Sequence, residues 1–157
     1  MSISFEHAID IARSPEEVFA VLDDVSQTPK WLAPCKGIER LTPGPSEVGS
    51  QFRYSYHDFG RSGTMDGVIT ARIPNQQLSV KYHDSMVEVL LDFRLSPTGT
   101  GTWLIHRIEV TTKTFFAGMF SPLIRSHLPK QTTTALDALR KLLEAGSEEV
   151  TPSNVAQ

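Results

Sequence analysis

The sequence predicts an α+β domain in which a long antiparallel sheet curls around one C-terminal helix. Two observations support this fold class. Alternating, strand-like segments run from about Cys35 to Lys113, and an amphipathic pattern follows from about Phe115 to Glu144. Such a sheet must bury its apolar face, and the helix is the element available to cover it. A cavity remains wherever side chains do not fill the space between them, so we expect a pocket.

The N-terminal segment predicts one strand followed by a capped helix. Residues 3–11 alternate between apolar and polar side chains, which is typical of a half-buried strand. Ser14, Pro15 and Glu17 then have the spacing of a capping box with proline at the first helical position. We expect a helix over 15–25 and a short further turn near Trp31.

Six more strands are expected between recurrent turn signals, near 36–42, 50–58, 64–73, 77–83, 86–96 and 102–113. Their alternation assigns one set of side chains to the concave face of the sheet: Phe52, Tyr54, Tyr56, Leu78, Val80, Tyr82, Val87, Val89, Leu91, Phe93, Leu95, Leu104, His106, Ile108 and Val110. Charged residues occupy the opposite faces, where we interpret them as solvated pairs.

Length, composition and charge limit the classes of protein to which the chain can belong. The 157 residues suit a single domain over 1–146, and the polar stretch 147–157 is expected to be a disordered tail. No apolar run reaches the ~18 residues of a membrane span, and no basic, apolar leader opens the chain. A single cysteine, Cys35, fits a cytoplasmic location. The net charge of −3, with scattered lysines and arginines, argues against nucleic-acid binding.

Several motifs resemble those of the START-like, or helix-grip (SRPBCC), superfamily, in particular its polyketide cyclase/dehydrase and lipid-transport group. They are Ile9-x-Ile11, Ser14-Pro15-Glu16-Glu17-Val18-Phe19, Asp24, Pro29-x-Trp31, Val48-Gly49-Ser50-x-Phe52, Gly101-Thr102 and Ala135-Leu136-x-x-Leu139. The resemblance implies a helix-grip fold: a curved seven-stranded antiparallel sheet around a long C-terminal helix, short helices after the first strand, and an apolar cavity. It carries no catalytic motif over to this chain, because members include carriers, cyclases and chaperone activators.

The sequence gives no reason to expect a metal ion or a cofactor. Its five histidines lack the close spacings of common metal sites. The glycines of Thr98-Gly99-Thr100-Gly101 lie between two strands, which indicates a hairpin loop and not a phosphate-binding turn.

His106 is the main candidate for a functional side chain. Its position between Leu104 and Ile108 places an imidazole on the apolar face, where it needs a hydrogen-bond partner. The commoner role of such a residue is a satisfied core histidine. The functional alternative is a group that orients a ligand or acts as a catalytic acid or base.

Other candidate ligand-binding residues surround it. Phe93 and Leu104 share its face, and Tyr54 and Tyr56 each offer a ring with one polar handle, although plain core packing suits them equally. Phe116 and Phe120 belong to the apolar segment 115–120, which we interpret as a lid. A dimer contact or a membrane contact would give the same sequence. His127 could reach the cavity mouth or solvent.

These features predict a pocket of roughly 300–1,000 Å³ that binds an apolar or aromatic small molecule. The alternative function is a cyclase- or dehydratase-type enzyme with His106 as acid or base. A third is a protein-interaction module of the chaperone-activator kind. The sequence leaves the ligand open, and it is compatible with a monomer or a homodimer.

Overall fold

A computed structural model describes the backbone of residues 2–58 and 60–156 and the side chains up to Ala145. Its elements are β1 (Ser2–Ile11), α1 (Pro15–Asp23), a 3₁₀ turn (Val25–Gln27), α2 (Thr28–Trp31), β2 (Cys35–Arg40), β3 (Gln51–Asp58), β4 (Arg61–Ile73), β5 (Gln77–His83), β6 (Val87–Pro97), β7 (Thr102–Thr112), α3 (Phe115–Met119) and α4 (Ser121–Ala156). The tail expected over 147–157 lies outside the described side chains, so its disorder stays a prediction.

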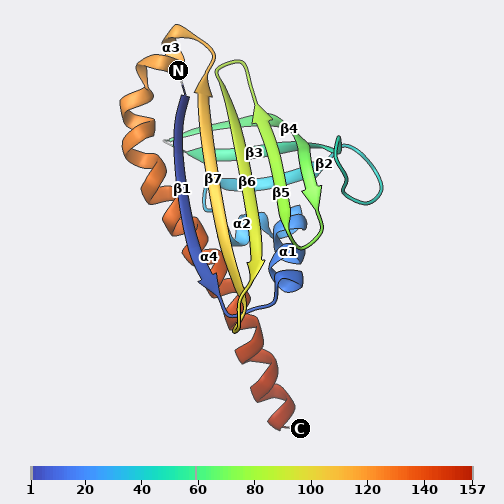
Figure 1. The fold of residues 1–157 in the computed structure, drawn as a ribbon. Helices are drawn as coiled ribbons and strands as arrows, with labels where there is room; N and C mark the ends of the chain where they lie inside the picture. The colour runs from blue at the N-terminus through green and yellow to red at the C-terminus, as the bar shows by residue number, and fades with distance from the viewer. Residues whose placement is uncertain (1, 59, 157) are drawn as a thin grey trace.

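The strands form one seven-stranded antiparallel sheet in the order β1-β7-β6-β5-β4-β3-β2. Figure 1 shows the sheet curving around α4, which runs along its concave side next to β1. Register shifts between Cys35 and Gly37 and between Ile69 and Ala71 add bends to β2 and β4. This architecture confirms the expected helix-grip fold.

The first helix begins as its capping signal predicts. Ser14 is extended at the N-cap, and its hydroxyl oxygen accepts a hydrogen bond from the Glu17 backbone N–H at 3.2 Å. Val18, Phe19 and Leu22 then lie on the buried face of α1. The helix therefore covers one end of the concave sheet.

The C-terminal helical pattern, expected from about Phe115 to Glu144, divides into two helices. The chain forms a short α3, leaves helical geometry at Phe120, and starts α4 at Ser121. Pro122 has no N–H to donate to the carbonyl of Gly118, so one continuous helix would lose a hydrogen bond at this point. The break makes α3 a separate element beyond the end of α4.

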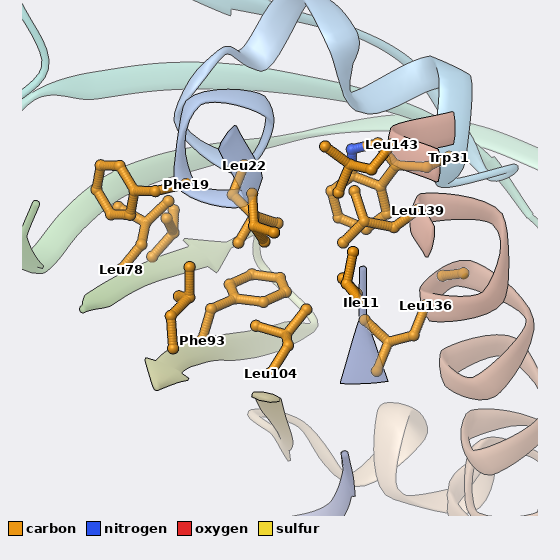
Figure 2. Close-up of a cluster of buried hydrophobic side chains, with 14 of the residues drawn as sticks. Ile11, Phe19, Leu22, Trp31, Leu78, Phe93, Leu104, Leu136, Leu139 and Leu143 are labelled. Carbon is orange, nitrogen blue, oxygen red and sulfur yellow. The ribbon is translucent and has the colours of Figure 1, made fainter. Parts of the chain in front are cut away.

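The main core lies where α1, α2 and the middle of α4 close over the sheet. Figure 2 shows Phe19, Leu22, Trp31, Leu136 and Leu139 converging with side chains of the sheet in this cluster. A second, small cluster forms near the start of α4 from Ile3, Val110 and Leu128. The two clusters pack the ends of the domain and leave the space between them less filled.

Candidate ligand-binding cavity

A cavity of about 530 Å³ lies between the concave face of the sheet and the helices. The strands contribute Ile38, Phe52, Tyr54, Tyr56, Met65, Ile69, Leu78, Val80, Tyr82, Val87, Val89, Leu91, Phe93, His106, Ile108 and Val110. The helical segments contribute, among others, Leu22, Trp31, Phe120, Leu123, Ile124, His127, Leu128, Gln131, Thr132 and Ala135. Most of these side chains are apolar, which suits an apolar occupant.

His106 occupies the buried part of this cavity. It is 6% exposed and stacks on its cross-strand neighbour Phe93, with ring centroids 4.1 Å apart and planes within 9°. Trp31 meets the same phenyl ring edge-on at 6.3 Å. The three aromatic rings fix the position and orientation of the imidazole.

The hydrogen bonding of His106 defines its protonation state. Its Nδ1 lies 3.1 Å from the backbone carbonyl oxygen of Asp92, and because a carbonyl only accepts, Nδ1 carries the proton. Burial lowers the pKa of His106 to about 4; the hydrogen bond to Asp92 opposes the shift, and the neighbouring His7 adds to it. The ring is therefore neutral at pH 7, and Nε2 is an unprotonated acceptor with no partner among the described residues.

Three tyrosines on β3 and β5 form part of the wall. The rings of Tyr54 and Tyr82 lie 5.1 Å apart, and those of Tyr54 and Tyr56 lie 6.1 Å apart. Burial, with a smaller contribution from Cys35, raises the pKa of Tyr54 and of Tyr82, so both phenols stay protonated. They can donate a hydrogen bond to a ligand but cannot supply an anion.

Gly67 makes room for one of these rings. A Cβ atom at this position would lie 2.4 Å from Cε1 of Tyr82. The glycine in β4 therefore allows its cross-strand partner Tyr82 to lie flat against the sheet.

Polar groups gather at one end of the cavity. Asp58 Oδ2 accepts a hydrogen bond from Gln131 Nε2 at 3.1 Å, and Asp58 Oδ1 lies 3.8 Å from His127 Nε2. Arg61 pairs with Asp58 across the β3–β4 hairpin and also lines the cavity. This end, which we call the mouth, combines a carboxylate, an imidazole, a guanidinium and an amide.

The structure separates the candidate residues into two groups. Tyr54, Tyr56, Phe93, His106, Phe120 and His127 line the cavity. Leu104 does not, because it is 0% exposed and packs in the main core near the start of β7. Phe116 does not either, because it projects from α3 with 70% of its surface exposed.

Several lining residues were not among the sequence candidates. Tyr82 had a detectable signal, because it lies on the same alternating face as Val80. Trp31 had a weaker one, in the motif Pro29-x-Trp31. Asp58 and Gln131 had none, because only the fold brings these two side chains together across 73 positions.

Other kinds of site find little support among the described residues. No group of three or more histidine, cysteine, aspartate or glutamate side chains there could hold a metal ion. Cys35 is buried, and burial raises the pKa of its thiol to about 11, which disfavours the reactive thiolate. Among these residues, too, no helix has the length and apolar character needed to cross a bilayer.

Comparison with known proteins identifies the class. Residues 2–144 match the family described as polyketide cyclase / dehydrase and lipid transport, so the chain belongs to that family. The motifs of the sequence had predicted this membership. A search of curated proteins finds no match.

Solved structures agree with the fold. An aromatase/cyclase, Zhui, from Streptomyces sp. R1128 is 16% identical with a TM-score of 0.78, and the match covers 92% of this chain and 94% of that one. A START superfamily protein from Mycobacterium smegmatis is 20% identical with a TM-score of 0.72, covering 92% and 97%. At these identities the likeness shows a shared fold.

Proposed function

We propose that the chain binds an apolar or aromatic small molecule in the cavity between the sheet and α4. The observation that carries this proposal is the cavity itself, about 530 Å³ with a mostly apolar wall and the neutral ring of His106 in its buried part. Burying apolar ligand surface there supplies the affinity. We also propose a cytoplasmic location for the protein, which its single cysteine supports.

The unprotonated Nε2 of His106 adds selectivity for ligands with a hydrogen-bond donor. A hydroxyl group can donate to Nε2, whereas a carboxylate would bring its own lone pairs against an acceptor in an apolar environment. Tyr54 and Tyr82, protonated and buried, are further groups that could meet a ligand oxygen. We therefore propose a neutral, hydroxyl-bearing ring compound as the preferred ligand class.

This selectivity can be measured with 1-naphthol and naphthalene as probes. The protein should bind 1-naphthol more tightly, with about 1 kcal/mol, or roughly fivefold, arising from the hydroxyl contact to His106. His106→Phe keeps a ring stacked on Phe93 and should remove that preference while it still binds naphthalene. An unchanged ratio of the two dissociation constants in the variant would contradict the role of Nε2.

Catalysis is the second candidate function, and the mouth provides the observation that favours it. His127 and Asp58 approach within 3.8 Å, as an imidazole and a carboxylate that could exchange a proton with a ligand. His106, the acid or base expected from the sequence, has no titratable side chain hydrogen-bonded to it among the described residues. A cyclisation activity lost in His127→Gln and kept in His106→Phe would assign the chemistry to the mouth.

The interaction-module alternative is less supported. A filled interior would favour it, because the cavity would then be incidental to function. The described side chains instead leave about 530 Å³ between sheet and helices.

A further inference from the structure

Five large apolar side chains lie exposed on α3 and the first turn of α4. Their exposed fractions are 82% for Phe115, 70% for Phe116, 64% for Met119, 50% for Phe120 and 48% for Leu123. We call this set the apical patch, because Figure 1 shows α3 at the end of the molecule opposite the free end of α4. Grouped exposure of this kind marks a contact surface.

The fold holds the apical patch in this orientation through small and polar groups. The Thr114 hydroxyl oxygen caps α3 by accepting from the Ala117 backbone N–H at 3.0 Å. Ala117 is 3% exposed and is the buried residue of the helix. Because α3 packs against the domain through this small alanine, its larger side chains point outward and are not part of the core.

The charged side chains closest to the apical patch in the sequence are all positive. Between Glu109 and Asp137 the chain contains Lys113, Arg125 and Lys130 but no aspartate or glutamate. All three cations are exposed. The complete chain carries a net charge of −3, so this segment differs in sign from the rest of the protein.

Two acidic side chains that line the cavity with Phe120 and Leu123, Asp84 and Asp58, already have partners. The Asp84 carboxylate accepts the backbone N–H groups of Met86 and Val87 at 2.7 and 2.8 Å. Asp58 interacts with Gln131 and His127 at the mouth. Lys113 Nζ donates a hydrogen bond to the backbone carbonyl oxygen of Asp84 at 2.9 Å, so this cation lies beside one of these residues.

An apolar patch flanked by cations fits the surface of an anionic bilayer. Phenylalanine and methionine can enter the boundary between head groups and acyl chains, while lysine and arginine stay with the phosphates. A second copy of the chain fits less well, because a symmetric contact would bring the two sets of cations together.

The apical patch is also continuous with the cavity. Phe120 and Leu123 are about half exposed and at the same time line the cavity wall. A ligand leaving a bilayer beneath the patch would meet apolar side chains along its path. The same surface can therefore hold the protein at the membrane and turn the adjoining part of the cavity toward the bilayer.

We propose that α3 and the start of α4 dock the protein reversibly on anionic membranes, with Phe115, Phe116 and Met119 entering the bilayer boundary. This interaction goes beyond ligand binding and requires no ligand. Its failure would leave the cavity proposal standing, and a failure of the cavity proposal would leave membrane docking testable.

Co-sedimentation of the full chain with vesicles tests the proposal. The protein should bind vesicles of phosphatidylcholine mixed with phosphatidylserine, more weakly vesicles of phosphatidylcholine alone, and the preference should fall with added salt. Phe115→Ser with Phe116→Ser should weaken binding by about a hundredfold, roughly tenfold for each phenyl ring. Arg125→Gln with Lys130→Gln should weaken it by about thirtyfold.

Val48→Ser is the matched control. Val48 is also apolar and 61% exposed, but it lies in the loop between β2 and β3, far from α3 in Figure 1. This variant should bind like the parent protein. Absence of vesicle binding, equal binding to both vesicle types, or full binding by the double phenylalanine variant would overturn the proposal. A dimer that the double variant abolishes, without vesicle binding, would assign the patch to a second copy instead.

Discussion

Replacing Gly101 with alanine is expected to lower the free energy of unfolding by about 3 kcal/mol or more. A Cβ atom there would lie 2.0 Å from the carbonyl oxygen of Ile11 and 2.8 Å from the backbone nitrogen of Arg13. Both contacts are with backbone, so no side-chain rotation can relieve them. The Thr102 hydroxyl also donates to the Arg13 carbonyl oxygen at 2.7 Å, which ties the two segments together.

Chemical denaturation of Gly101→Ala and Gly99→Ala provides the comparison. Gly99 lies in the same loop between β6 and β7, and nothing lies within 4 Å of a Cβ atom added there. Gly99→Ala should therefore change stability by only a few tenths of a kcal/mol. Equal stability of the two variants would show that the chain at β1 does not pack against Gly101 as described.

Acidification should destabilise the protein through His106. The unfolded ring has an ordinary pKa near 6.5, whereas burial lowers the pKa of the folded ring to about 4. Between these values the unfolded state binds the additional proton, so stability falls as pH falls from about 6.5 to about 4. The full loss from this group is roughly 3 kcal/mol, and none of it appears above pH 6.5.

Comparison with His106→Phe isolates this contribution from that of the carboxylates. Below pH 6.5 the parent protein should lose stability more steeply than the variant, and above it the two curves should run parallel. His127→Gln serves as the control histidine, because its partly exposed ring lies at the mouth. If the parent and His106→Phe have the same pH dependence between 4 and 6.5, His106 is not held neutral by burial.

The elements of the fold followed from local signals in the sequence. The Ser14–Glu17 cap starts α1 where the pattern predicts, and β5 has the bounds expected from alternation, 77–83. Alternation also determines which face of a strand is apolar, because neighbouring side chains point to opposite sides. That is why His106 and Tyr54 were expected on the concave face.

The cavity itself depends on packing, which alternation does not describe. Leu104 and His106 share one face of β7, yet Leu104 fills the main core that α1 and the middle of α4 close, whereas His106 borders the cavity. The direction of Phe116 depends on the anchoring of α3 through Ala117, which the amphipathic pattern did not reveal. Contacts such as Gln131 with Asp58 require the completed fold.

Titration with the neutral fluorophore N-phenyl-1-naphthylamine tests the central claim, that the cavity binds an apolar molecule. The parent protein should bind one equivalent saturably. Ala135→Phe adds a ring from the α4 side of the cavity and should abolish binding without loss of folding, whereas Ala20→Phe, on the exposed face of α1, should bind normally. Absence of saturable binding by the parent, or unchanged affinity in a folded Ala135→Phe variant, would contradict the account.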